Sequence, residues 1–445
     1  MDGTGTVAGQ QNIFIGDNAG GGSWTTAASN SNVAIGATAM SDALNGALGN
    51  TALGHDTLKA LTEGDYNVAI GHTTGDALTT GGYNTLLGQA AGGGLVGGGT
   101  NIAIGYQPLY NGTANNYVVA IGSRAGYNST ADYNVYVGSN AGREIRAGGS
   151  QNYIGNSAGY YATGSYNTFV GESAGLGGTT SAPFSSGENN VAIGYEALKS
   201  FTTADKCVAI GSGAGKAHQT AAWGVYIGYE AGNDVTTGAQ NVLIGGDAGA
   251  KLTTADRNIA IGGAALQTAT TGGSNTVVGD NAGWSATTAS GSVFMGRLAG
   301  GNIDSANANV AIGQQALENV DAGSDGNVAV GYKAGNAHTN AGNQGSVYIG
   351  HKAGQGIVNS QVTMIGWEAG SGYSGIGKGE GTTLIGHRSG YLSNDDAINN
   401  TAVGYATLYA NTAGERNTVM GRSAGFEITT GDNNTLIGYN TQGPL

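Results

Sequence analysis

The sequence predicts an all-β chain folded as an elongated β-solenoid, and three observations lead to this prediction. A pentapeptide with the common form Asn-Val-Ala-Ile-Gly recurs along the chain, neighbouring copies lie about 17 residues apart, and apolar residues alternate within each copy. A unit of this length is too short for a pair of helices and lacks their helical period. It fits one coil of a solenoid built from short strands and turns.

The glycine that ends each pentapeptide marks the repeat. It occurs 25 times, and 14 of the 24 intervals between neighbouring copies have the same length, as from Gly54 to Gly71 and from Gly71 to Gly88. We therefore expect about 25 stacked coils of about 17 residues, each supported by its neighbours. Residues 11–442 form a single repeat domain in this interpretation, with an insertion near 181–187. An N-terminal segment at 1–10 precedes it and a tail at 443–445 follows it.

Within each copy, the residue before the closing glycine is Ile, Leu, Val or Met in all 25 cases. Two positions earlier most copies have Val, Ile or Thr, and period-two spacing puts this pair on one side of a strand. The residue between them ranges from Ala34 to Tyr136 and points to the opposite side. Either set can fill the coil interior, in which case the other set faces a partner. The sequence alone leaves both arrangements open.

Two further positions of the pentapeptide have structural explanations. The closing glycine suits a turn with positive φ or a close backbone approach, and the representative turn glycines are Gly36, Gly71, Gly194, Gly313 and Gly438. The opening Asn occurs in most copies, and stacked Asn side chains form ladders along such a stack. Cys207, the only cysteine, occupies this Asn position, so we expect a partly buried and unreactive thiol.

A single coil cannot fold alone. Ordering about 17 residues costs roughly 1–2 kcal/mol each in backbone entropy, whereas burying two aliphatic side chains returns only about 3–6 kcal/mol. Stability must come from the neighbouring coils. Because one of the two apolar sides would otherwise be a long exposed stripe, which monomers rarely tolerate, we expect lateral association with further copies of the chain.

Composition excludes several classes of function. The net charge of −13 repels phosphate, so no nucleic-acid partner is expected. No run of 18 apolar residues exists, so we expect no membrane insertion. Carboxylates are dispersed and no nucleophile-and-base set stands out, so we expect no catalytic residues and no enzyme activity. Neither a cofactor nor a metal site is predicted.

The repeat Asn-Val-Ala-Ile-Gly-x-x-Ala resembles the head-domain repeats of trimeric autotransporter adhesins. The Gly-Tyr-Glu-Ala-Gly and Thr-Thr-Gly segments, at 228–232 and 236–238, also look like the shafts of bacteriophage tail fibres. The resemblance implies a left-handed parallel β-roll in which three chains pack side by side and bind a surface. It covers 11–442, although the repeat of the adhesin heads is shorter and no anchor strands or heptad stalk follow.

The two residues after each closing glycine are the variable, polar part of the coil. Aromatic and charged groups side by side there suit sugar recognition, and the candidate contacts are Tyr195, Glu196, Tyr229, Glu230, Tyr332, Lys333, Trp367, Glu368, His387 and Arg388. The plainer interpretation is a solvated face with stacked tyrosines. A second set precedes the strands and is better explained by stacking between coils; it comprises Tyr66, Tyr83, Tyr117, Tyr133 and Tyr166.

Two metal hypotheses carry little weight. Histidines 55, 72, 351 and 387 share the position after the glycine, while histidines 218 and 338 do not, and none forms a helical ligand pair. Aspartates 65, 205, 256 and 432 lie near turn glycines but lack the strict nonapeptide spacing of calcium-binding β-rolls.

The function expected from these observations is a non-enzymatic fibre or adhesin component, either of a phage tail fibre or of a bacterial surface. It would be a homotrimer located outside the cell, on a virion or a cell surface, and would bind a surface glycan or protein receptor. The alternative is an extracellular structural filament that polymerises end to end through open coil edges. A fibre with glycosidase activity and an ice-binding solenoid rank lower.

Overall fold

The structure, a computed structural model, describes residues 9–22, 27–178, 185–320, 323–336, 344–356, 361–371, 380–393 and 397–443. All the regular secondary structure in these residues is β-strand, so the predicted all-β solenoid is confirmed. The chain divides into two compact units, Met1–Trp223 and Gly224–Leu445, which are described separately. Residues 181–184 of the predicted insertion, 1–8 of the N-terminal segment and 444–445 of the tail lie outside the described residues.

Each coil contributes one strand of three residues. The strands of the first unit are β1 (Ile13–Ile15), β2 (Val33–Ile35), β3 (Thr51–Leu53), β4 (Val68–Ile70), β5 (Thr85–Leu87), β6 (Ile102–Ile104), β7 (Val119–Ile121), β8 (Val135–Val137), β9 (Asn152–Ile154), β10 (Thr168–Val170), β11 (Val191–Ile193) and β12 (Val208–Ile210). The strands of the second unit are β13 (Val225–Ile227), β14 (Val242–Ile244), β15 (Ile259–Ile261), β16 (Thr276–Val278), β17 (Val293–Met295), β18 (Val310–Ile312), β19 (Val328–Val330), β20 (Val347–Ile349), β21 (Thr363–Ile365), β22 (Thr383–Ile385), β23 (Thr401–Val403), β24 (Thr418–Met420) and β25 (Thr435–Ile437).

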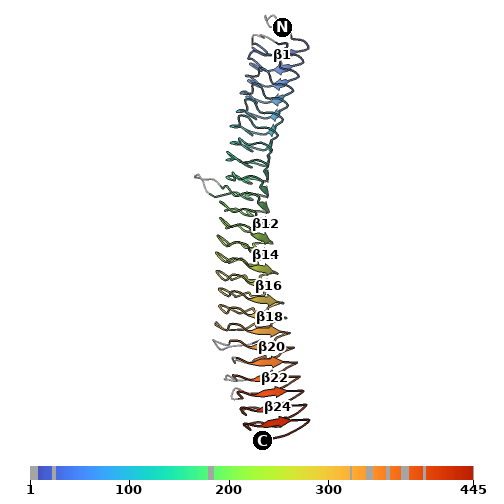
Figure 1. Cartoon of the computed structure of the whole chain (residues 1–445). Coiled ribbons are helices and arrows are strands. Elements are labelled where there is room, and N and C mark those ends of the chain that lie inside the picture. Colours follow the sequence, from blue (N-terminus) through green and yellow to red (C-terminus); the bar gives the residue numbers. More distant parts are fainter. Residues whose placement is uncertain are drawn as a thin grey trace. The chain divides into compact units, whose positions relative to one another are not determined.

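Within each unit, every strand pairs in parallel with the next strand of the chain. In Figure 1 the labelled strands from β14 to β24 follow one another along one side of the second unit. Equivalent residues of successive coils are paired, for example Val242 with Ile259 and Ile244 with Ile261. Each position of the repeat therefore forms a column of equivalent residues, one from each coil, along the stack.

The structure resolves which side of the strand faces inward. The middle residue of the strand is buried in nearly every coil, whereas the two residues on either side of it are half-buried or exposed. Tyr136, Tyr226 and Phe294, for instance, have no exposed area, whereas Met295 is 42% exposed. The variable middle position thus fills the coil interior, and the regular aliphatic pair lies outside.

The interior accommodates a middle residue of variable size by compensation within the coil. Where the middle residue is Ala, a large side chain often lies four residues after the closing glycine, as Leu198 does after Ala192. Where the middle residue is large, that position is glycine in every coil but the last: a Cβ on Gly300 would lie 2.7 Å from the Phe294 ring. Most coils therefore supply one large side chain to the core, and close packing without overlap follows.

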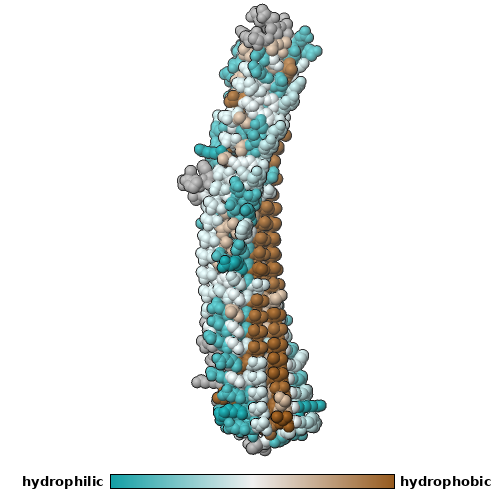
Figure 2. Space-filling model, viewed as in Figure 1, coloured by the Kyte–Doolittle hydropathy of each residue, from teal (hydrophilic) through white to brown (hydrophobic). Residues whose placement is uncertain are grey.

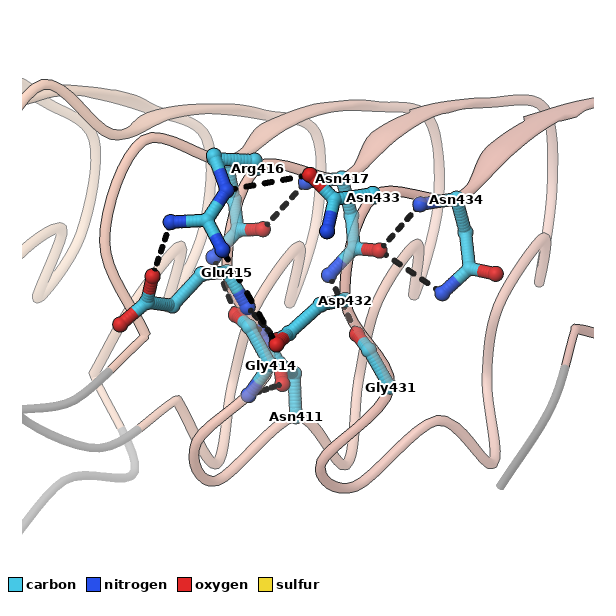
Figure 3. A network of polar contacts seen from close by, with 10 residues as sticks. Asn411, Gly414, Glu415, Arg416, Asn417, Gly431, Asp432, Asn433 and Asn434 are labelled. Atoms are coloured by element: carbon cyan, nitrogen blue, oxygen red, sulfur yellow. Dashed lines mark hydrogen bonds and ion pairs between the residues drawn. The ribbon is translucent and has the colours of Figure 1, made fainter.

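The predicted Asn ladder is present inside the coils. The Oδ1 atom of Asn258 accepts hydrogen bonds from the main-chain N–H and the Nδ2 of Asn275, at 3.1 and 3.0 Å. Figure 3 shows the same pattern between Asn417 and Asn434, where both distances are 2.9 Å. Cys207 occupies this position and is buried. Each ladder amide satisfies polar groups that the narrow core would otherwise leave unpaired.

The closing glycines stack on one another at the end of each strand. Gly36, Gly71, Gly194 and Gly313 have φ values of 139°, 139°, 132° and 130°. A Cβ on Gly194 would lie 2.5 Å from the carbonyl oxygen of Gly211 in the next coil. Both conditions exclude any other residue at this position. Gly438 has a similar φ of 131°, but the nearest atom to its Cβ position is a Thr441 methyl at 3.2 Å.

Candidate binding face

The outward residues of each strand form two columns, of which the second is aliphatic in every strand and the first is Val or Ile in most strands, Thr in nine and Asn in β9. The first column consists of the first strand residue, such as Val242, and the second consists of the third strand residue, such as Ile244. In the second column the exposed members include Ile15 at 57%, Ile154 at 43% and Met420 at 48%. Figure 2 shows two such columns side by side along the strands of the second unit. We call these two columns together the aliphatic face.

Toward the C-terminal end, the aliphatic face becomes narrower. From β21 to β25 the first column consists only of threonine, while the second remains aliphatic in every strand. In Figure 2 one of the two columns accordingly turns pale. Thr has nearly the shape of Val but carries a hydroxyl, so the first column keeps its form in these coils while it becomes more polar.

A further column borders the aliphatic face at each end of the strand. The leading column contains the residue just before the ladder position, and the trailing column contains the residue just after the closing glycine. All residues of the leading column have positive φ values, for example 54° at Tyr66 and 64° at Trp223. Because a left-handed residue turns the chain sharply, the leading column lies at a corner of the coil.

In the first unit the leading column carries the second tyrosine set noted in the sequence. The rings of Tyr66 and Tyr83 are tilted by 32° with their centroids 5.2 Å apart, and those of Tyr117 and Tyr133 stack at 5.1 Å. The five tyrosines of this set, Tyr166 included, are 51–64% exposed. Stacking between coils is therefore confirmed for Tyr117 and Tyr133, whereas Tyr66 and Tyr83 meet with tilted rings. All five tyrosines present aromatic edges beside the aliphatic face.

The trailing column holds the aromatic members of the candidate sugar contacts. In the second unit, His351 lies between Tyr332 and Trp367, with ring centroids 5.3 and 3.9 Å apart. His387 stacks on Tyr405 at 4.9 Å. These rings direct their faces at one another along the stack, so a ligand beside them meets mainly ring edges and polar atoms.

Tyr195 and Tyr229 have different neighbours. The next residue of the trailing column is Ser212 after Tyr195 and Gly246 after Tyr229, and neither has a ring that could cover the tyrosine. The two tyrosines are 52% and 59% exposed. A hydrogen bond to Glu230 raises the pKa of Tyr229. These are the two candidate residues at which a sugar ring has room to stack face-on.

The charged candidates follow directly in the chain and share a left-handed backbone. Glu196, Glu230, Lys333, Glu368 and Arg388 have φ values of 55°, 50°, 52°, 53° and 53°. This conformation places them on the turn beyond the trailing column.

Most of these charges are already paired within the chain. Glu196 contacts Lys199 at 2.6 Å and Lys216 at 2.7 Å, and these lysines lower its pKa to about 2. Arg388 lies 2.7 Å from Glu368 and lowers the pKa of that carboxyl. The Lys333 ammonium lies over the Tyr332 ring, 5.5 Å from its centroid. The Glu196–Lys216 and Glu368–Arg388 pairs join neighbouring coils, and all of these contacts hold the side chains in defined positions.

The aspartates weighed as calcium ligands have structural hydrogen bonds instead. Asp65, Asp205, Asp256 and Asp432 each accept a main-chain N–H bond from the preceding coil, at 2.7–2.8 Å. Figure 3 shows Asp432 in this role beside Glu415. In the described part of the chain, no group of three or more His, Cys, Asp and Glu side chains is placed to hold a metal ion.

His338 lies outside the described residues, and the histidines at 55, 72 and 218 stack or are buried. His55 stacks on His72 with centroids 5.3 Å apart. His218 is buried beside Cys207, with Nε2 3.5 Å from the sulfur, and burial lowers its pKa. Neither pair provides a third ligand.

Sequence reasoning left the orientation of the aliphatic face open, although the pattern contained a signal. The position of the second column is aliphatic in all 25 copies, whereas the middle position varies and is compensated four residues after the closing glycine. Compensation is typical of a shared interior, and it identifies the middle position as the buried one.

Comparison with protein-family models and with curated proteins finds no match for this chain. Within the residues that the structure describes, no helix has the length and apolar character needed to cross a bilayer.

Proposed function

We propose that this protein is a non-enzymatic structural fibre or adhesin component in which three copies pack through their aliphatic faces. The observation that carries this proposal is the exposed aliphatic face. With one strand every ~4.8 Å and two columns ~7 Å apart, the strip in each unit covers on the order of 500 Å². The largest apolar patch on a typical monomer is about 300–600 Å² and is often functional, so a strip of this size in each unit supports an interaction surface.

The chemistry of the face favours burial against protein. Most of its side chains are aliphatic and lie in regular rows, which can interdigitate with an identical row on another copy. Tyrosine-rich columns border it in the first unit, and aromatic residues are enriched in protein interfaces. A repeated apolar β-face is also a site for aggregation if it is left open. Burial of this face in a closed assembly removes that site.

The assembly leaves the trailing column and the turns beyond it exposed at its rim, where they present candidate contacts to a receptor. We propose that a glycan or protein on a cell surface binds there, with Tyr195 and Tyr229 as the stacking residues. Location outside the cell, on a virion or a cell surface, follows from this role. The resemblance to adhesin heads and tail-fibre shafts supports the same function.

The decisive test is the mass of the native particle. Sedimentation equilibrium of the wild-type chain should give three times the chain mass at all concentrations well above the dissociation constant of the trimer. The triple variant I244T/I261T/V278T replaces three members of the second column with a residue of high strand propensity. We expect this variant to dissociate at a concentration at least tenfold higher, with an unchanged circular dichroism spectrum. A monomeric wild type would refute the proposal, and growth with concentration would favour the end-to-end filament.

Receptor binding is tested separately. A glycan array should give binding to the wild-type protein that is lost in Y195A/Y229A and kept in Y66A/Y83A, because only the first pair has room for face-on stacking. Incubation with the bound polysaccharide should leave its chain length unchanged. Depolymerisation would show a glycosidase instead of a passive binder.

A further inference from the structure

Two tyrosines of the leading column lie against each other in neighbouring coils. Tyr117 and Tyr133 precede β7 and β8, and these strands pair in register through Val119 and Val135. The two rings are parallel to within 4°, and their centroids are 5.1 Å apart. The pairing of the coils therefore holds together two phenol groups that are 16 positions apart in the sequence.

Both rings are accessible from solvent and have room to turn. The exposed fraction is 55% for Tyr117 and 63% for Tyr133. An exposed ring turns about its side-chain torsions without displacing a neighbour, whereas a ring in a close-packed core does not. A diffusing oxidant can thus reach both hydroxyls, and the two rings can then adjust to each other.

The chemistry open to two adjacent phenols is oxidative coupling. We propose that Tyr117 and Tyr133 form an oxidative cross-linking site, at which a peroxide acting through a one-electron oxidant joins the two rings as dityrosine. Each phenol gives one electron and one proton to the oxidant and becomes a phenoxyl radical. A carbon–carbon bond then forms between the ring carbons next to the two oxygens, and the hydrogen on each of these carbons moves to the neighbouring oxygen. One hydrogen peroxide accepts the two electrons and the two protons and becomes two water molecules.

Proximity decides which tyrosines couple. Two radicals must meet before either is quenched, and a stack that keeps them side by side turns this encounter into a step within one molecule. The main chain fixes both residues in place. The N–H of Tyr117 donates to the carbonyl of Gly99 at 3.2 Å, and the N–H of Tyr133 donates to the carbonyl of Asn116 at 3.1 Å. Coupling is therefore expected between these two coils and not with a distant tyrosine.

Several other tyrosines meet only one of the two requirements. Tyr166 belongs to the same column and is 63% exposed, but its neighbours in the column are Ser150 and Asn189. Tyr136 and Tyr153 lie side by side with their ring centroids 5.9 Å apart, but neither has any exposed area. An exposed ring without a partner and a paired ring without exposure are both unable to couple.

Two further ring pairs are less well placed. Tyr110 and Tyr127 stack at 5.2 Å, but both are half-buried. The Arg143 guanidinium also lies over the Tyr127 ring, 5.7 Å from its centroid. Tyr66 and Tyr83 are 51% and 64% exposed, but their rings are tilted by 32°. Among these pairs, only the one that precedes β7 and β8 combines high exposure with parallel rings.

The product of the coupling is a covalent staple between two coils. Each coil of a solenoid contacts only its neighbours, so a bond from one coil to the next resists their separation. A link between positions 16 apart in the sequence also restricts the unfolded chain, as a disulfide does. This consequence concerns a single chain and holds for any number of copies in the assembly.

Limited oxidation of the whole native chain tests the site. Treatment with peroxidase and hydrogen peroxide should give dityrosine fluorescence in a band of single-chain mass on a denaturing gel. Trypsin cuts after Arg124, between the two tyrosines, so this band should contain peptides 60–124 and 125–143 joined with the loss of two hydrogen atoms. The Y133F variant keeps the ring but lacks the phenol, and it should lower the yield of the joined peptides at least tenfold.

The matched control changes another tyrosine of the same peptide. Y127F removes a phenol from peptide 125–143 but leaves the leading column intact, so it should keep the wild-type yield. A yield that is kept in Y133F, or lost equally in Y127F, overturns the site. Joined peptides found only in bands of two or three chains would place the coupling between copies and would also overturn it.

The stability of the oxidised protein tests the staple. Oxidised wild type should unfold at a higher urea concentration than oxidised Y133F, whereas the two proteins should unfold alike before oxidation. Equal midpoints after oxidation would refute the staple even where the joined peptides form.

Discussion

At the scale of single residues, the interior depends on pairs of positions. Phe294 fills the coil because Gly300 leaves room for it, whereas Ala192 leaves room for Leu198. The left-handed φ of this glycine, 59° at Gly300, is also adopted by Leu198 at 47°. The backbone thus accepts either residue, and the choice depends on the size of the middle residue.

This compensation predicts a strong coupling between the two positions. G300L adds a side chain against the Phe294 ring and should destabilise the fold by about 1–3 kcal/mol. F294A leaves a cavity and should cost about 3–5 kcal/mol. The double variant reproduces the Ala-and-Leu pair of other coils and should lose less than the sum of the two. Urea unfolding of the four proteins measures the coupling, and additive losses would contradict it.

The Asn ladder predicts a different residue-scale effect. N258A removes the acceptor for the Asn275 N–H and the donor to the Gly272 carbonyl. Each buried group left without a partner costs about 1–3 kcal/mol, so the urea midpoint should fall markedly. The control N156A changes an Asn outside the ladder and should leave the midpoint unchanged. Equal effects of the two variants would show that the ladder is not a stabilising element.

At the scale of one coil, the sequence predicted the strand, the turn glycine and the ladder, because each is a local pattern repeated 25 times. The side of the strand that faces inward could not be predicted from local patterns. Alternation places Val242 and Ile244 on one side and Leu243 on the other, and all three are apolar. The decision comes from packing between Leu243 and Gly249, which lies beyond the strand on the following turn.

The candidate binding face was likewise predicted only in part from the sequence. Repetition identified the exposed position after the closing glycine, but the partners of its residues come from other coils. Glu196 pairs with Lys216 of the next coil, and Trp367 stacks on His351 of the preceding coil. The interval between closing glycines is not constant, being much longer from Gly171 to Gly194 than from Gly122 to Gly138. Such partners therefore become apparent only when the columns are aligned.

The ion pairs of the turn predict a pH dependence at this scale. The pKa of Glu196 is lowered from 4.5 to about 2, mainly by its hydrogen bond to Lys199. A carboxyl with a lowered folded-state pKa contributes stability above its unfolded pKa, and this contribution is lost as pH falls toward 2. Wild type should therefore lose more stability than E196Q between about pH 5 and about pH 2.5. The control E188Q, at an exposed carboxylate of the same unit, should follow wild type in urea titrations at both values.

At the scale of the whole molecule, the proposed assembly links folding to association. Most coils bury one large side chain from the two paired positions of the interior, while the most regular apolar residues, such as Ile244, lie outside. In such a chain, a large share of the apolar surface is buried only when other copies pack against it. Separation of the copies would expose both columns at once, so unfolding and dissociation should be coupled.

This coupling predicts that thermal stability depends on protein concentration. If three chains unfold together, mass action raises the unfolding midpoint as the total concentration increases. Calorimetry over a hundredfold range should show a steady rise for the wild-type protein. The I244T/I261T/V278T variant, examined below its association range, should unfold at a lower temperature that does not vary with concentration. A wild-type unfolding midpoint that does not vary with concentration under reversible conditions would contradict this coupling. It would mean that no other copy covers the aliphatic face of the folded chain, so that contact between copies adds nothing to stability.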